Sequence, residues 1–325
     1  MKATRAFNTL AEFTGDGVLV VDKPAGFTSH DVVQKVKTML GAAKVGHSGT
    51  LDPFATGVLV LLINGATKLA RFLADHEKTY VFTVSFGVET DTQDSTGKVV
   101  ARQPCENLQE EDIKAACGAF IGKIEQTVPR YSAVRVGGQR LYQLARRGIE
   151  VSPPNRTVEI KNLSFCEFHW PEATFQVTCS RGTYVRSLGV DLARHLNCKG
   201  HVSKLRRLAS GEFSLRQAVT LEQFEERLAR GELHQLLITS VQALDSYPEL
   251  RVSHLDAKRI RQGSTLESIQ FLGLGPGPGW SAGPHKVLDP DNNLVAMVSE
   301  AAKAANDRQD EEVTLKTLRV FGTAA

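Results

Sequence analysis

The sequence predicts an α/β (α+β) protein with two domains, of which the second is small and rich in strands. Residues 17–22 and 58–63 are short apolar runs typical of buried strands, and residues 30–40 between them carry apolar side chains at helical spacing. In residues 78–90 large apolar side chains alternate with smaller ones at a period of two, which predicts another strand. The length of 325 residues is enough for two domains with separate cores.

The remaining elements follow from the same patterns. Thr28 or Ser29 is placed to cap the helix over 30–40, which ends near Gly41. Helices are expected over 67–74 and 108–120 and after residue 184, and strands over 156–168 and 173–180. From residue 241 the composition changes, with a Gly/Pro-rich loop over 272–284, hairpin strands within 286–300 and 313–321, and an acidic-leaning segment over 301–312 between them.

Composition and the N-terminal residues indicate the class of protein. With 42% hydrophobic and 23% charged residues, the chain has the composition of a soluble globular protein. The N-terminal segment has no apolar core, and the longest aliphatic run has six residues, too few to cross a membrane. We therefore expect no secretion signal, no membrane contact and a cytoplasmic location.

The five cysteines, at positions 105, 117, 166, 179 and 198, contain no CxxC pair. This spacing argues against a zinc site and against a disulfide framework, and it favours a reducing compartment.

The segment with the most unusual composition is 46–57, GHSGTLDPFATG, which joins the first helix to the apolar strand over 58–63. Its three glycines and one proline specify a tight backbone path. Pro53 biases Asp52 toward an extended conformation, so the loop can aim a carboxylate from beside a buried strand. From these residues alone, an Asp-Pro turn without a chemical role stays open, because such turns are common.

The positive charge of the chain is concentrated in one stretch, although the net charge is only +3. Residues 129–156 contain six arginines and one acid, Glu150, with Tyr131 and Tyr142 among them. Arginines suit RNA phosphates, and aromatic faces suit unstacked bases. The residues alone leave two alternatives open, an RNA-binding stripe and a solvated charged surface.

GHSGTLDPFATGVL at 46–59 closely resembles the catalytic motif of the TruB family of pseudouridine synthases. Other segments that resemble family motifs are DKPAGFTS at 22–29, KTYVF at 78–82, TDTQDSTG at 90–97, GTYVR at 182–186 and HVSKLRR at 201–207. The resemblance implies that Asp52 is the catalytic carboxylate, that Tyr80 packs on the target base and that Arg186 pairs with Asp52. Arg186 lies in the first turn of its helix, where a cation opposes the helix dipole and therefore calls for an anionic partner.

The same motifs imply which residues surround the reaction. Substrate-binding roles fall on Lys23, Tyr184, Leu205 and His47, the last filling the stack when the base flips out. RNA contacts fall on Arg130, Tyr131, Arg135, Arg140, Arg146, Arg147, Arg206 and Arg207, with the alternative that Arg206 and Arg207 face acidic side chains. The carboxylates of the 87–97 loop are expected to cap turns. Val128-Pro129 departs from the Pro-Pro pair usual in the family.

The resemblance also implies a fold and an activity. The pseudouridine synthase fold has a mixed, mainly antiparallel central sheet flanked by helices. Residues 1–244 are expected to form the catalytic domain, with an RNA-gripping thumb insertion over about 127–154, and residues 245–325 a PUA-like RNA-binding domain. The implied activity is isomerisation of uridine 55 in the T loop of tRNA, by a monomer that binds the T arm and uses no cofactor or metal. The absence of nucleotide-binding and metal-ligand motifs agrees.

Two alternatives remain. One is the RNA-guided relative that works with guide RNAs and partner proteins, which lacks the thumb insertion that YSAVRVGGQRLY at 131–142 resembles. The other is a tRNA-binding folding helper in which catalysis is secondary.

Overall fold

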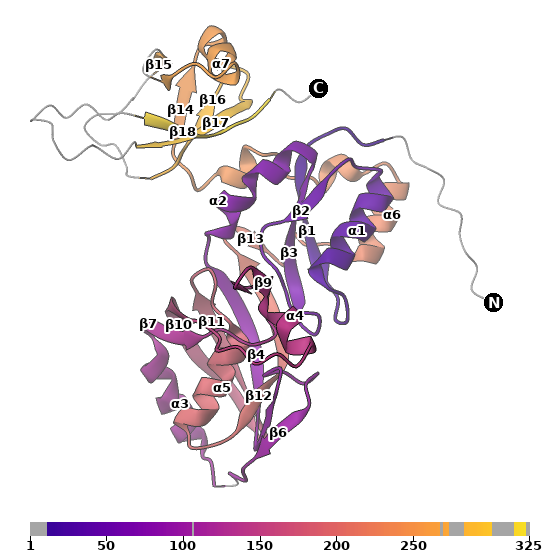
Figure 1. Ribbon diagram of the computed structural model, residues 1–325. Helices are drawn as coiled ribbons and strands as arrows, with labels where there is room; N and C mark the ends of the chain where they lie inside the picture. The colour runs from indigo at the N-terminus through magenta and orange to yellow at the C-terminus, as the bar shows by residue number, and fades with distance from the viewer. Residues whose placement is uncertain (1–11, 106, 267–268, 273–282, 301–314, 323–325) are drawn as a thin grey trace, which may run out of the picture.

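A nine-stranded sheet is the centre of the fold among the described residues, which are 12–105, 107–266, 269–272, 283–300 and 315–322 of the computed structural model. Its strands lie in the order β1 (Gly17–Lys23), β3 (Thr56–Ile63), β12 (Gly200–Ser210), β4 (Lys78–Phe86), β11 (Glu172–Cys179), β10 (Asn155–His169) and β7 (Gly122–Thr127), with β2 (Val45–His47) beside β3 and β13 (Phe213–Ser214) beside β12 (Figure 1). Only β3 and β12 run parallel to each other, and the other pairs are antiparallel. The mixed, mainly antiparallel sheet is confirmed.

Helix α1 (Ser29–Leu40) covers one half of the sheet and confirms the helix expected over 30–40. Its apolar face packs on β1 and β3. Thr28 makes a capping box with Asp31, and Gly41 ends the helix in the left-handed conformation. Of the two expected caps, Thr28 is therefore the one used, and Ser29 is free to contact the loop around Asp52.

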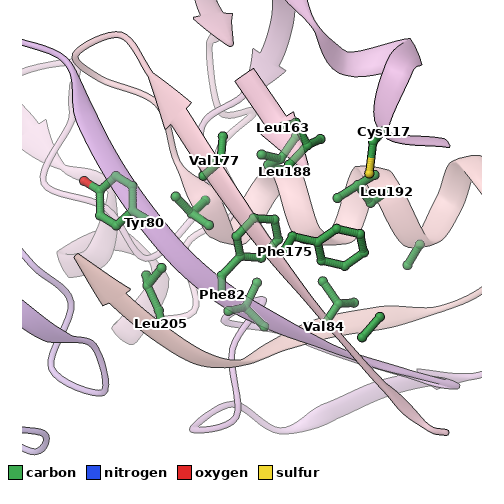
Figure 2. Close-up of a cluster of buried hydrophobic side chains, with 14 of the residues drawn as sticks. Tyr80, Phe82, Val84, Cys117, Leu163, Phe175, Val177, Leu188, Leu192 and Leu205 are labelled. Atoms are coloured by element: carbon green, nitrogen blue, oxygen red, sulfur yellow. The ribbon is translucent and has the colours of Figure 1, made fainter. Parts of the chain in front are cut away.

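The other half of the sheet is covered by α3 (Glu110–Cys117) and α5 (Val185–His195). Figure 2 shows side chains of β4, β11 and α5 in one apolar cluster, in which the rings of Phe82 and Phe175 stack with centroids 5.3 Å apart. Burying these large side chains is the main source of stability for this half. Strands β10 and β11 confirm those expected over 156–168 and 173–180, and α3 with the 3₁₀ turn η2 (Gly118–Phe120) covers most of 108–120.

Two expected elements differ in detail. The helix expected over 67–74 is a 3₁₀ segment, η1 (Asn64–Leu69), followed by the short α2 (Ala70–Ala74). The strand expected over 78–90 ends at Phe86, after which β5 (Val88–Thr90) pairs with β6 (Val99–Arg102) outside the main sheet. Alternation of side chains continues across the break, so the pattern alone could not locate it.

An insertion leaves the sheet where β7 and β10 meet. Thr127 pairs with Asn155 in that hairpin, so residues 128–154 begin and end at adjacent positions. The insertion contains a small hairpin, β8 (Arg135–Val136) and β9 (Gln139–Arg140), followed by α4 (Leu141–Arg146). These bounds agree with the segment over about 127–154 singled out in the sequence.

The C-terminal part forms a second, five-stranded sheet in the order β15 (Phe271–Leu272), β14 (Glu249–Val252), β16 (His285–Leu288), β17 (Leu294–Glu300) and β18 (Leu315–Val320), with α7 (His254–Arg261) packed on it (Figure 1). The hairpin strands within 286–300 and 313–321 are confirmed. Residues 273–282 of the expected Gly/Pro-rich loop and the acidic-leaning 301–312 lie outside the described residues. Helix α6 (Leu221–Ala229) and the 3₁₀ turns η3 (Leu233–Gln235) and η4 (Gln242–Leu244) connect the two sheets.

The cysteines correct one expectation. Cys105 and Cys198 form a disulfide with their Cα atoms 5.9 Å apart, whereas Cys117, Cys166 and Cys179 are free. The pair is separated by 93 residues, so short-range spacing could not indicate it. Within the described ranges, no three or more His, Cys, Asp or Glu side chains gather as they would around a metal ion. Likewise, none of the described helices combines the length and the apolar character that a membrane crossing needs.

Candidate active site

The loop between β2 and β3 holds Asp52 through contacts on both sides. Before it, the Ser29 hydroxyl accepts from the Leu51 amide at 2.8 Å and donates to the Leu51 carbonyl at 3.1 Å. After it, the Pro53 carbonyl accepts from the Gly26 amide at 2.8 Å and from the Lys23 ammonium at 3.3 Å. Four backbone-directed contacts therefore fix the direction of the Asp52 side chain, which is the order that a catalytic carboxylate needs.

Arg186 binds the Asp52 carboxylate in bidentate geometry. Its Nε lies 2.8 Å from Oδ2 and its Nη2 lies 3.1 Å from Oδ1. The Arg186 side chain is 3% exposed and that of Asp52 is 32% exposed. The carboxylate is therefore bound by a buried guanidinium and remains partly accessible to solvent. The two parallel hydrogen bonds fix the plane of the carboxylate. The anionic partner expected for Arg186 is confirmed.

The rest of the Arg186 guanidinium is held by residues that the sequence did not connect with Arg186. Nη1 donates to the Thr92 carbonyl at 2.7 Å, and Nη2 donates to the Tyr131 carbonyl at 3.0 Å. The Asp94 carboxylate, buried, lies 3.7 Å from Nη1. Asp94 also caps its own turn by accepting from the Thr96 amide at 2.9 Å, as expected for this loop. The 87–97 loop therefore has a second task, which is to orient the arginine that holds Asp52.

Tyr80 and Leu205 lie in the apolar cluster that also contains Leu51 of the Asp52 loop. Figure 2 shows Tyr80 at one end of this cluster, near Leu205, with its hydroxyl pointing away from the other side chains. Burial raises the pKa of the Tyr80 phenol above its ordinary value of 10.0, although Arg207 acts in the opposite direction. The phenol is therefore neutral near pH 7.

Lys23 lies at the site but is 0% exposed. Its ammonium donates to the carbonyls of Pro24, Phe27 and Pro53 at 2.8, 2.7 and 3.3 Å. Burial lowers the pKa of Lys23 from 10.5 to about 8, and the nearby Asp52 carboxylate partly offsets this. Direct substrate contact is therefore contradicted for Lys23 by its burial, and the side chain ties the β1–α1 turn to the Asp52 loop instead.

The two arginines of β12 point to opposite faces of the sheet. Arg206 pairs with Asp22, with its Nη2 2.6 Å from Oδ2 and its Nη1 3.1 Å from Oδ1, which is the acidic alternative left open for it. Arg207 is 2% exposed and donates to the backbone carbonyls of Gly49, Thr50 and Val58. The expectation that Arg207 contacts RNA is therefore wrong, because a buried guanidinium cannot reach a phosphate.

His47 and Tyr184 lie on the elements next to the site. His47 ends β2, and its buried Nδ1 makes no hydrogen bond within the described part of the chain. Tyr184 precedes α5, where its amide and carbonyl both bond to the Gln126 side chain, at 2.7 and 3.0 Å. These backbone contacts position the start of α5, and so Arg186; the structure brings no contact of the Tyr184 ring to Asp52.

The ionisation of His47 predicts how stability depends on pH. Burial, with a smaller effect of Arg207, lowers the pKa of His47 below its ordinary value of 6.5. Below pH 6.5 the unfolded chain binds a proton that the folded chain does not, so the free energy of unfolding decreases as the pH falls. Urea unfolding of wild type and His47→Gln between pH 7.5 and 5.5 should show a flatter acid limb for the variant. His169→Gln, at an exposed position, is the control; an identical slope in wild type and His47→Gln would contradict the prediction.

The arginines of the insertion lie on its surface. Arg130, Arg135, Arg140, Arg146 and Arg147 are all exposed, and Tyr131 is half-buried. The guanidinium carbon of Arg146 lies 5.6 Å from the centre of the Tyr142 ring. Through its Tyr131 carbonyl the insertion reaches Arg186, so a basic surface is attached directly to the Asp52 site.

Comparison with known proteins agrees with this geometry. The N-terminal domain model of the TruB family pseudouridylate synthases matches residues 37–185, and the C-terminal domain model of tRNA pseudouridylate synthase B matches residues 186–247. A protein of Syntrophobacter fumaroxidans named tRNA pseudouridine synthase B is 41% identical over 86% of this chain and 92% of its own. A protein of the same name from Geobacter sulfurreducens is 39% identical over 94% of this chain and 99% of its own.

Solved structures support the same fold. A crystal structure of a Cbf5-Nop10-Gar1 complex matches with a TM-score of 0.71 at 24% identity, over 94% of this chain and 85% of the other. The structure of an H/ACA RNP bound to a substrate RNA containing 2′-deoxyuridine matches with a TM-score of 0.69 at 22% identity, over 95% and 86%. Identity near 40% with the sequence relatives extends over most of the chain, and the range matched by the TruB N-terminal model includes Asp52. The chain therefore belongs to the TruB family of pseudouridylate synthases, and it is a pseudouridine-forming isomerase.

Proposed function

We propose that this protein converts uridine 55 in the T loop of tRNA to pseudouridine, as a cytoplasmic monomer that needs no guide RNA and no cofactor. The observation that carries the proposal is the Asp52 carboxylate, bound in bidentate geometry by a buried arginine and half-open to solvent beside Tyr80 and Leu205. The names of the sequence relatives support tRNA as the substrate.

The reaction moves one bond and leaves the composition of the nucleotide unchanged. The N1–C1′ bond breaks, the uracil turns, a C5–C1′ bond forms, the C5 proton leaves and N1 gains a proton. Asp52 is the group that acts at the sugar, either by attacking C1′ or by removing a C2′ proton. Arg186 holds the Asp52 carboxylate in one orientation for either step, through Nε at 2.8 Å and Nη2 at 3.1 Å. A single placed carboxylate also differs from the paired acids of most glycosidases.

Tyr80 and His47 are proposed to handle the flipped base. A uridine stacked in folded RNA cannot reach Asp52, so it must leave its stack, which costs about 3 kcal/mol. We infer that His47, on the strand before the loop, fills the vacated position, and its lowered pKa supports a neutral ring there. The Tyr80 ring offers an aromatic face for the uracil, and its neutral phenol would pass on the C5 proton only by releasing its own hydroxyl proton in the same step.

The insertion and the C-terminal sheet are proposed to bind the rest of the tRNA. The five exposed arginines and Tyr131 in residues 128–154 suit the T arm, and the contact of the Tyr131 carbonyl with Arg186 supports a position of the arm near Asp52. An insertion of this kind favours a stand-alone enzyme over the RNA-guided alternative. Residues 245–325 are proposed as a PUA-like RNA-binding domain, with Lys258 and Arg259 exposed on α7. Binding by these two parts is compatible with a second role in tRNA folding.

The decisive experiment uses a tRNA transcript tritiated at uracil C5. Purified protein is mixed with it in the absence of added cofactor, and tritium released to water is counted. We expect release, and we expect it to disappear when uridine 55 is replaced by cytidine. Tight binding without release would favour the folding-helper function instead, and release from the cytidine 55 transcript would move the site elsewhere in the tRNA.

The arginines of the insertion give a separate prediction about binding. Arg146→Ala combined with Arg147→Ala should weaken tRNA binding and reduce the slope of log Kd against log salt by about 2, because each lost phosphate contact removes nearly one released counterion. Filter binding from 50 to 300 mM salt, a range of about sixfold suited to such slopes, measures this. Arg194→Ala, which removes an exposed arginine paired with Glu89, is the control. An unchanged slope would place Arg146 and Arg147 away from the RNA.

A further inference from the structure

We propose that Arg207 is a positioning residue of the isomerisation, which fixes the two ends of the loop that carries Asp52. The inference rests on the proposed function of Asp52 and assigns a part of its precision to a side chain that does not meet the RNA. Its basis is a buried guanidinium that contacts two carbonyls of this loop and one carbonyl of the strand that follows it.

The contacts of Arg207 reach the loop on both sides of Asp52. Nη2 donates to the Gly49 carbonyl at 3.1 Å, Nη1 lies 3.4 Å from the Thr50 carbonyl, and Nε donates to the Val58 carbonyl at 2.6 Å. The backbone of Arg207 is also paired with Gly57 where β12 runs parallel to β3. One residue therefore holds positions 49, 50, 57 and 58, which flank Asp52 in the chain. A planar guanidinium with donors in a fixed fork suits this task, and an ammonium does not.

The surroundings of the Arg207 charge indicate that this side chain does more than occupy space in the core. No carboxylate of the described residues lies within ion-pair distance of it, whereas its neighbour Arg206 pairs with Asp22. A buried cation without a carboxylate is costly, and apolar side chains often replace buried charges without loss of stability. Retention of the charge is therefore best explained by what the guanidinium does for the loop.

The positive charge of Arg207 also affects the titratable groups around the site. Arg207 lies close enough to Tyr80, His47 and Lys23 to lower the pKa of each of them. Its positive charge thus opposes the effect of burial on Tyr80 and adds to the effect of burial on His47 and Lys23. Arg207→Lys keeps the positive charge but removes the planar guanidinium, whereas Arg207→Gln removes the charge as well. The test therefore uses both variants.

The test compares Arg207→Lys and Arg207→Gln with the wild type in single-turnover tritium release, after circular dichroism shows that each variant is folded at the assay temperature. We expect Arg207→Lys to lose about 100-fold in rate, since small displacements of a reacting group have effects of that size. The Kd for tRNA should change little, because Arg207 is 2% exposed. Arg207→Gln should lose more, and its rate should depend differently on pH. Arg194→Gln, at an exposed pair, is the control.

A second variant disturbs the same contact from the loop and leaves the arginine in place. The Cβ of a residue at position 49 would lie 3.7 Å from Nη1 of Arg207, so Gly49→Val adds a branched side chain directly beside the guanidinium. We expect a lower rate with an intact fold. A normal rate in either folded Arg207→Lys or folded Gly49→Val would overturn the role of Arg207, as would a loss confined to tRNA affinity. Absence of tritium release by the wild type would instead contradict the proposed function.

Discussion

Replacement of Asp52 by asparagine is expected to abolish isomerisation, with a loss of at least about 1,000-fold in the single-turnover rate. The amide has nearly the shape of the carboxylate but is neutral, so it can neither attack C1′ nor remove a C2′ proton. It would also present a donor or a weaker acceptor to Arg186, whose Nε and Nη2 now lie 2.8 and 3.1 Å from the two oxygens. Tritium release from C5-labelled tRNA measures the rate, and filter binding measures the Kd, which should be nearly unchanged.

The control for this variant is Asp75→Asn, since Asp75 forms an exposed ion pair with Arg181 and exposed pairs contribute little. Asp75→Asn should release tritium at the rate of the wild type. A rate within tenfold of wild type for Asp52→Asn would remove Asp52 from the chemistry, and a parallel loss of binding would show that the variant is misfolded.

The Asp52–Arg186 pair shows what the sequence could predict. The tight loop pointed to an aimed carboxylate, and the position of Arg186 in a first helical turn called for an anion. The two residues are 134 positions apart in the sequence. Only the resemblance to the TruB motifs joined them before the fold brought β3, β12, β4 and α5 together. Spacing rules describe one helix or one hairpin, and they carry no information about contacts over such separations.

The supporting residues were harder to predict for a related reason. Thr92 and Tyr131 hold Arg186 through backbone carbonyls, which every residue has, so their identities carry no signal. Arg206 and Arg207 look equivalent in the sequence. Successive side chains of a strand point to opposite faces, so one of them had to enter the interior. Lys23 was expected to bind substrate and Arg207 to contact RNA or acidic side chains, whereas both are buried, which is rare for Lys and Arg. The Asp52 loop is where that rule fails, because its unpaired carbonyls provide acceptors.

Gly57→Ala is expected to destabilise the protein by at least about 4 kcal/mol, among the largest effects of single substitutions. Gly57 has φ of +102°, where an L-residue is strained. A Cβ there would also lie 2.2 Å from the carbonyl oxygen of Arg207 and 2.8 Å from its nitrogen. Both are backbone atoms of β12, so relief would require β3 and β12 to separate at the end of the Asp52 loop. Urea unfolding followed by circular dichroism measures the loss, and the tRNA isomerisation rate should fall with it.

Gly26→Ala separates backbone strain at a positive φ from the steric clash with Arg207. Gly26 also has a positive φ, +83°, but a Cβ at this position would meet no atom within 4 Å. Its substitution therefore adds conformational strain alone, which costs about 1–2 kcal/mol. If Gly57→Ala destabilised the protein no more than Gly26→Ala, the close approach of the Arg207 backbone would not restrict the side chain at position 57. Strands β3 and β12 would then separate there at little cost. A difference of more than about 2 kcal/mol between the two variants would show that close packing of Arg207 on Gly57 holds the base of the catalytic loop.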